Sequence, residues 1–204
     1  MIIDDRLILS RDGGYTLTTV LGRTIQLAEK AFGKRDLHYT ILGFHFTGRD
    51  SGISFFEDPY TVLVRLGTNC LYDLELACYQ LAHETVHLLS PVKSELVTVL
   101  EEGVATRFGC DFMLNHSHNL GWPILGSRWS STSDQAYNRA MFAADRLLRI
   151  DQDAISSLRQ IQPAISCMNP EMIHSRFPDL SLNDAAELCE PFPEWKEKLS
   201  SGRA

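Results

Sequence analysis

The residues best suited to chemistry in this sequence are His83, Glu84 and His87, which form the pattern His-Glu-x-x-His. Two residues four positions apart lie on one face of an α-helix, about one turn apart, so both imidazoles can present a nitrogen to a single cation. Glu84 lies beside them and is suited to act as a base. This arrangement predicts a zinc site. The alternative is that both histidines lie on a polar helix edge and bind nothing.

A catalytic zinc usually takes three protein ligands and keeps a fourth position for water. The segment after the histidines, which also reads as a helix, offers Glu95, Glu101 and Glu102 as third ligand. On a helical wheel Glu101 and Glu102 fall on opposite borders of the apolar stripe, and either border could face the metal. A glutamate that does not bind the metal would be a solvated side chain or a hydrogen-bond partner of a ligand.

The same residues resemble a known group of enzymes. The His-Glu-x-x-His pattern followed by residues 100–105, Leu-Glu-Glu-Gly-Val-Ala, resembles the gluzincin metallopeptidases, whose third ligand is a glutamate on the next helix. In aminopeptidase-like members this glutamate directly precedes a glycine, which favours Glu102. The resemblance covers about residues 60–110. It implies a zincin-like fold, Zn²⁺ bound by His83, His87 and Glu102, and Glu84 as general base.

Gluzincins commonly stabilise the developing oxyanion with a tyrosine or histidine. We predict Tyr137 in this role, although its place on an apolar helical stripe also suits a core tyrosine. His116, His118 and Arg128 are further candidates in the preceding loop. Thermolysin-like members also place an aspartate four residues after the third ligand, where this chain has Thr106, so support for the histidines must come from elsewhere.

The implied activity is hydrolysis of peptide bonds. Zinc lowers the pKa of its bound water, and Glu84 accepts the proton and later returns it to the leaving amine. In zincins the strand before the active-site helix usually pairs with an extended substrate, so residues 60–66 are expected to do so. The alternative function is a zincin-like binding or regulatory module without turnover. The presence of Glu84 argues against it, since pure binding needs no base.

The elements that must position these residues follow from hydrophobic periodicity. We expect helices at 15–32, 72–89 and 94–114, with Ser94 as the cap of the last, and strands at 39–46 and 60–66. Helical stripes recur around 137–148 and 155–161, and Ser181 with Asp184 resembles a capping box before a last short helix. The prediction is one domain, residues 1–204, of the α+β class: a small N-terminal sheet flanked by helices, an active-site helix and a mainly helical C-terminal half.

Composition limits the partners. The 204 residues carry a net charge of −7, which disfavours nucleic acid, and no apolar run approaches the roughly 18 residues of a membrane span. The five cysteines include no Cys-x-x-Cys pair and suit reduced thiols. The acidic start of the chain lacks the features of a secretory signal, so we expect a cytoplasmic protein. The predicted partner is a peptide or protein substrate, and the sequence does not indicate an oligomeric state.

Overall fold

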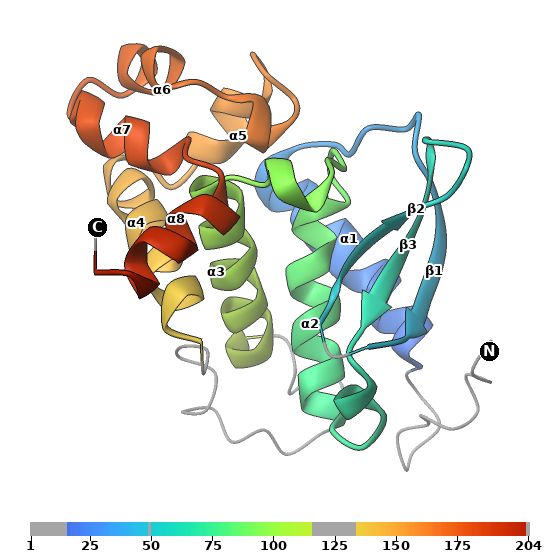
Figure 1. Cartoon of the computed structure of the whole chain (residues 1–204). Helices are drawn as coiled ribbons and strands as arrows, with labels where there is room; N and C mark the ends of the chain where they lie inside the picture. Colours follow the sequence, from blue (N-terminus) through green and yellow to red (C-terminus); the bar gives the residue numbers. More distant parts are fainter. Residues whose placement is uncertain (1–15, 49, 116–133, 203–204) are drawn as a thin grey trace.

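The computed structural model describes residues 16–48, 50–115 and 134–202, over which the chain forms eight α-helices and one three-stranded sheet (Figure 1). In chain order the elements are α1 (Leu17–Phe32), β1 (Thr40–Phe46), β2 (Gly52–Phe55), β3 (Thr61–Leu66), α2 (Leu74–His87), α3 (Val99–Asn115), α4 (Gln135–Ile150), α5 (Ala154–Arg159), α6 (Pro170–Arg176), α7 (Leu182–Leu188) and α8 (Phe192–Ser200). Short 3-10 helices lie at Thr68–Leu71, Ser94–Leu96 and Ile165–Cys167. After α1, the three strands come together and the remaining α-helices follow, which confirms the predicted α+β class.

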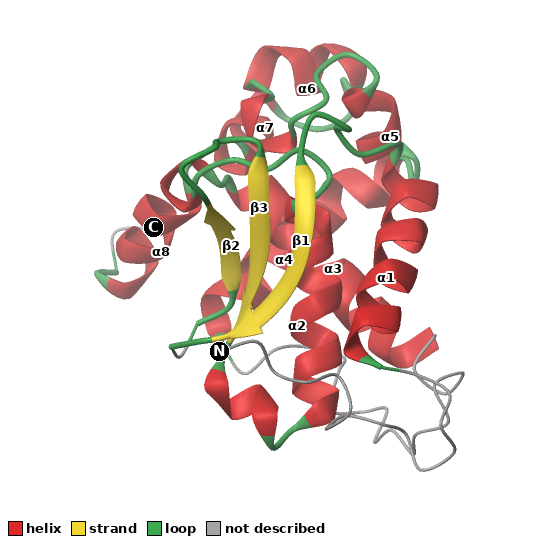
Figure 2. Ribbon diagram, turned by 90° about the vertical axis from the view of Figure 1, so that its right-hand side faces the viewer, coloured by secondary structure: helices red, strands yellow, loops and turns green. Residues whose placement is uncertain are grey.

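The sheet has the order β1-β3-β2, so β3 is its central strand. It runs parallel to β1 and antiparallel to β2. Every second residue of β3 is fully buried (Val62, Val64 and Leu66), and these side chains face α1 and α2. The alternate residues, Arg65 among them, therefore lie on the outer face of the sheet. Figure 2 shows the sheet face-on, with β2 at one edge and β1 at the other, nearer to α1.

Two hydrophobic clusters make up the core. One joins α1, the inner face of the sheet and α2, and the other joins α3, α4 and the C-terminal helices. α2 and α3 lie side by side between these clusters, and α4 packs on the other side of α3 (Figure 1). Phe108 of α3 contacts both clusters. The His-Glu-x-x-His segment is thus held where the sheet half and the helical half of the molecule meet.

Side-chain caps begin several helices close to the predicted positions. Asp73 accepts a hydrogen bond from the backbone N–H of Leu76 and begins α2, and Ser181 accepts one from the N–H of Asp184 and begins α7. The predicted cap at Ser181 is therefore confirmed, and its hydroxyl also donates to the Asp184 carboxylate. The prediction that Ser94 caps the ligand helix is wrong. Ser94 begins only a 3-10 turn, and α3 starts at Val99.

The late start of α3 has a tertiary cause. Residues 97–99 are tied to the segment just before α8: the N–H of Val99 donates to the Glu190 carbonyl, and the N–H of Phe192 donates to the Val97 carbonyl. These bonds require an extended backbone at Val97, where a helix cannot run. Three further elements were not predicted: the short strand β2, and α6 and α8 of the C-terminal half.

A buried arginine of α5 binds the C-terminal ends of α1 and α2. Arg159 of α5 is 7% exposed and donates hydrogen bonds to backbone carbonyls of Phe32, Gly33, Lys34, Leu89 and Pro163. It thereby satisfies carbonyls at the C-terminal ends of α1 and α2, which lack partners within their own helices. None of the helices in the described part of the chain is long and apolar enough to span a membrane.

Candidate metal centre

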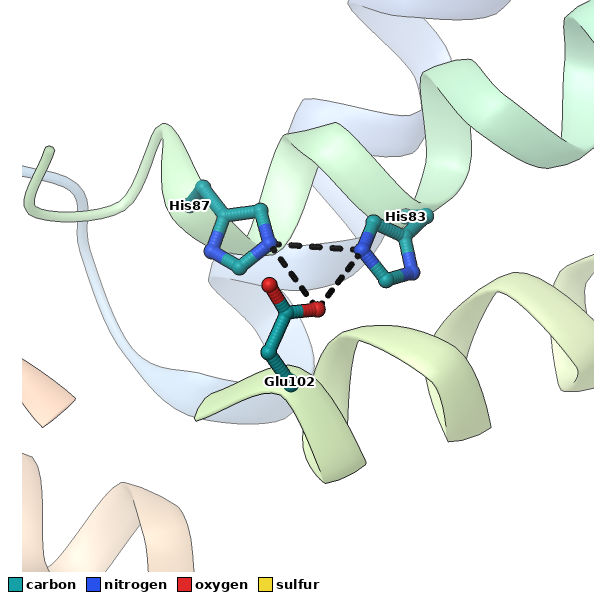
Figure 3. Close-up of side chains that lie close together, drawn as sticks. All are labelled: His83, His87 and Glu102. Carbon is teal, nitrogen blue, oxygen red and sulfur yellow. Dashed lines mark hydrogen bonds and ion pairs between the residues drawn. The ribbon is translucent and has the colours of Figure 1, made fainter. Parts of the chain in front are cut away.

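Three side chains from two helices converge at the junction of the two core clusters (Figure 3). His83 and His87 project from one face of α2, and Glu102 projects toward them from α3. The two Nε2 atoms lie 3.3 Å apart, and Glu102 Oε2 lies 3.2 Å from Nε2 of His83 and 3.8 Å from Nε2 of His87. The three potential ligand atoms fall within 4.8 Å of one another. Two imidazoles and one carboxylate are a donor set that catalytic zinc uses.

Burial also suits a cation at this point. His83 and His87 are 6% and 7% exposed, and Glu102 Oε2 is a buried oxygen that accepts no well-aligned hydrogen bond. A buried carboxylate oxygen without a donor is costly unless a positive charge compensates it. The residues present therefore fit a divalent metal.

Glu101, the other candidate ligand, faces a different partner. Its Oε1 lies 2.8 Å from His87 Nδ1, and its Oε2 accepts hydrogen bonds from the backbone N–H and the hydroxyl of Ser166. A carboxylate at Nδ1 requires that nitrogen to carry the proton, which leaves Nε2 of His87 free to bind a metal. The geometry thus favours Glu102 as the third ligand and makes Glu101 the support of His87.

No carboxylate in the described ranges supports Nδ1 of His83 in the way that Glu101 supports Nδ1 of His87. Nδ1 of His83 is buried and has no hydrogen-bond partner among the residues that the structure describes. Its ring is held by packing instead, with ring centroids 6.2 Å from Tyr79 and 5.9 Å from Tyr137. Only one of the two imidazoles is therefore oriented by a carboxylate within the described part of the chain.

The charged side chains of the cluster shift one another's pKa values. Burial alone would lower the pKa of His87, but the hydrogen bond to Glu101 and the charges of Glu102 and Glu84 raise it to about 10. Burial alone would raise the pKa of Glu102, yet its contact with His83 and the charge of His87 lower it. Glu102 is therefore ionised, as a metal ligand must be.

The cluster opens onto a cleft of about 720 Å³. Glu84 lines this cleft beside the histidines and is 2% exposed. Tyr137 of α4 lines it as well, against the ring of His83. Burial, followed by the charges of Glu102 and Glu84, raises the pKa of the Tyr137 phenol, so that it remains a hydrogen-bond donor. The structure thus brings all five predicted site residues together around one cleft.

The glycine of the Glu-Gly string has a packing role. A Cβ on Gly103 would lie 2.2 Å from the backbone oxygen of Ala140 and 2.8 Å from Cβ of Ala144. The missing side chain therefore lets α4 pass very close to α3. Because Tyr137 precedes Ala140 by about one turn, this close approach helps bring its ring to His83.

Some site residues were not found from the sequence. Tyr79 lines the cleft from α2, one turn before His83, and its four-residue spacing was a usable signal. Lys196 of α8 lies 2.7 Å from an oxygen of Asp134 and 4.9 Å from the Tyr137 ring centroid. It comes from the far end of the chain, and no sequence pattern connects it to the histidines.

Other candidates lie elsewhere. Glu95 is exposed on the 3-10 turn before α3 and does not belong to the cluster. His116, His118 and Arg128 fall outside the described residues.

One expectation about the substrate is wrong. Residues 60–66 were expected to pair with an extended peptide, but β3 already has β1 on one side and β2 on the other. Its backbone groups are used within the sheet. β2 has a free edge in the described part of the chain, and Gly52 and Ile53 line the cleft.

Comparisons of the chain with models of known families, with curated proteins and with solved structures gave no match. The resemblance to the gluzincins consequently rests on the local sequence pattern.

Proposed function

We propose that this protein is a zinc metallopeptidase of the zincin type, with His83, His87 and Glu102 as the metal ligands. The observation that carries the proposal is the buried group of two imidazole nitrogens and one carboxylate oxygen within 4.8 Å of one another, open to a cleft that Glu84 also lines. A structural metal site has no need of a base or of an open cleft, since all its positions are filled by protein.

The chemistry follows from these side chains. Zinc held by the three ligands would lower the pKa of a water molecule and polarise a substrate carbonyl. Glu84 would accept the proton from that water and deliver it to the leaving amine. The protonated phenol of Tyr137 would donate a hydrogen bond to the oxygen on which negative charge develops. Glu101 would keep the His87 ring in the orientation that offers Nε2 to the metal.

The substrate that suits this cleft is an extended peptide. The free edge of β2 offers backbone donors and acceptors along one wall, which an extended chain can use by strand addition. The opposite wall consists of side chains from α4 and α8, with Tyr137, Phe192 and Lys196 contacting one another. A peptide along β2 would pass between this wall and the sheet.

A second candidate is a zincin-like module that binds a partner without turnover. It requires the same metal cluster but no function for Glu84. The two proposals therefore differ in the effect of the change Glu84→Gln.

The experiment combines metal analysis with peptide cleavage. Purified protein should contain one zinc per chain, and His83→Ala should lose it. Glu84→Gln should abolish cleavage of a quenched-fluorescent peptide library yet retain zinc, whereas the matched change Glu95→Gln, at an exposed site outside the cluster, should retain both. Absence of zinc would refute the metal site. Full zinc with no cleavage of any peptide by the wild type would favour the binding module.

A further inference from the structure

Arg65 lines the wall of the cleft and has no ion-pair partner among the residues that the structure describes. Its Nε is buried and has no hydrogen-bond acceptor, and the described part of the chain provides no ion pair for its guanidinium. The other half-buried arginines in the described part of the chain are engaged. Arg35 donates to the Tyr39 carbonyl, Arg107 pairs with Asp145, and Arg146 pairs with two acids of α7. A guanidinium has five donors and keeps its charge at all relevant pH values, so an unpaired one beside a cleft is suited to an external anion.

The path of the Arg65 side chain explains how it reaches the cleft. Arg65 lies on the outer face of β3, directly opposite Gly52 of β2. A Cβ built on Gly52 would lie 2.7 Å from Nη2 of Arg65, so the guanidinium occupies the space that a side chain would fill there. The absence of a side chain at Gly52 thus lets Arg65 cross the edge strand toward the cleft.

The other charged side chains that line the cleft do not form an ion pair with Arg65 in the described part of the chain. Lys196 is paired with Asp134 on the opposite wall. Glu102 belongs to the metal cluster, and Glu84 lies beside the histidines. Asp50 lines the same cleft, but no ion pair joins it to Arg65. No carboxylate of the described residues therefore satisfies this guanidinium.

We propose that Arg65 binds a carboxylate of the substrate, so that the protein prefers peptides carrying an acidic group at the position that lies along Gly52. This inference rests on the proposed peptidase function. A guanidinium and a carboxylate form charge-assisted, often bidentate hydrogen bonds, which neutral side chains cannot replace. The carboxylate can belong to an Asp or Glu side chain or to the C-terminus of the peptide.

The test uses zinc-loaded protein and matched octapeptides. A series of quenched-fluorescent peptides carries Asp or Asn at each position in turn, and every peptide is made with a free and with an amidated C-terminus. We expect one position at which Asp is preferred over Asn by about 10- to 100-fold in kcat/KM. Rising salt should reduce this preference. If the free C-terminus alone gives the gain, the bound carboxylate is the terminal one.

Variants assign the preference to Arg65. Arg65→Met should make the Asp and Asn peptides equivalent, and Arg65→Glu should favour Lys at the same position. Arg23→Met, on an exposed position of α1, is the matched control and should keep the preference for Asp. Zinc content and melting temperature of each variant show that it is folded. No acidic preference in the wild type, or a preference that survives Arg65→Met, would overturn the proposal.

A binding measurement keeps this result separate from the peptidase proposal. Fluorescence anisotropy of the labelled Asp and Asn peptides with the Glu84→Gln protein requires no cleavage. Binding of the Asp peptide that is stronger, and depends on Arg65, would support the carboxylate site even if the wild type cleaved nothing. Equal binding of both peptides would overturn it, whether or not the wild type is a peptidase.

Discussion

Glu101 and Glu102 are neighbours in the sequence, yet their carboxylates meet different nitrogens of the two histidines, and one pair of substitutions can separate the roles that we propose for them. Glu102 Oε2 lies 3.2 Å from Nε2 of His83, on the side where a metal would bind. Glu101 Oε1 lies 2.8 Å from Nδ1 of His87, on the far side of that ring. The changes Glu101→Gln and Glu102→Gln remove the same charge from adjacent positions of one helix. Their effects on zinc affinity and on folding should run in opposite orders.

Zinc affinity should depend mainly on Glu102. Glu102→Gln removes an anionic ligand from a buried site, whereas Glu101→Gln leaves all three ligand positions intact and weakens only the hydrogen bond that orients His87. Loss of such a supporting group typically costs about 10- to 100-fold in metal affinity. We therefore expect Glu101→Gln to fall within about this range and Glu102→Gln to exceed it.

Folding of the metal-free protein should depend mainly on Glu101. It is 2% exposed and accepts from three donors, namely His87 Nδ1–H and the backbone N–H and hydroxyl of Ser166. A buried donor left unsatisfied costs about 1–3 kcal/mol. Glutamine retains one acceptor oxygen, which can keep both Ser166 donors but then turns its amide N–H groups toward His87 Nδ1–H, so we expect a loss of about 1–3 kcal/mol for Glu101→Gln from this one donor. Glu102 Oε2 accepts no aligned hydrogen bond, and Glu101 and Glu84 keep their charges near His87 after Glu102→Gln, so this change should cost less than Glu101→Gln.

Two assays measure these effects independently. Competition with a chromophoric chelator gives the zinc affinity, and urea denaturation in the presence of a strong chelator gives the free energy of unfolding of the metal-free protein. Glu95→Gln, at an exposed site outside the cluster, should change neither. If Glu101→Gln lost more zinc affinity than Glu102→Gln, the assignment of the third ligand would be wrong, although a zinc site could still exist.

Three further predictions concern packing, pH and the buried arginine. Gly103→Ala should lower the free energy of unfolding by about 3 kcal/mol in urea denaturation, because the new Cβ would meet the backbone oxygen of Ala140 at 2.2 Å; an effect below about 1 kcal/mol would contradict the close helix contact. Burial alone would raise the pKa of Asp134, but its ion pair with Lys196 and its N-cap hydrogen bond lower it. Its contribution should therefore be complete above the unfolded pKa of about 3.9 and be lost as the pH falls through the lower folded value, so that the stability difference from Asp134→Asn shrinks on acidification. Arg159→Lys should cost about 3 kcal/mol in the same assay, since one ammonium cannot serve five backbone carbonyls; a stability equal to that of the wild type would show that these bonds contribute nothing.

Local sequence patterns were enough to predict the elements that have a clear hydrophobic period or a clear residue spacing. The histidine pair is set by the helical repeat, and the helix that holds it begins at an Asp cap that the chain itself supplies. The strands β1 and β3 and the helices α1 and α4 have clear hydrophobic periods, so their positions could be predicted within a few residues. The α+β class followed from their order.

Tertiary structure decided the features that depend on distant contacts. A helical wheel leaves Glu101 and Glu102 at two borders, and only the packing of α3 against α2 shows which carboxylate meets the Nε2 atoms. Likewise, the bonds from residues 97–99 to the segment before α8 override the local preference for a cap at Ser94.

The walls of the cleft also depend on contacts between distant parts of the chain and could not be predicted from the sequence. β2 is four residues long and too short to show a period, so the order β1-β3-β2 and the free edge could not be foreseen. Lys196 approaches Tyr137 from the last helix, and Arg65 reaches the cleft only because Gly52 lies opposite it in the register. The sequence by itself determined which residues are candidates to bind a metal and to activate water, because those properties depend on residue type and on spacing within one helix. The tertiary structure decided which carboxylate meets the two Nε2 atoms and which charges face the cleft, because those properties depend on contacts between residues far apart in the chain.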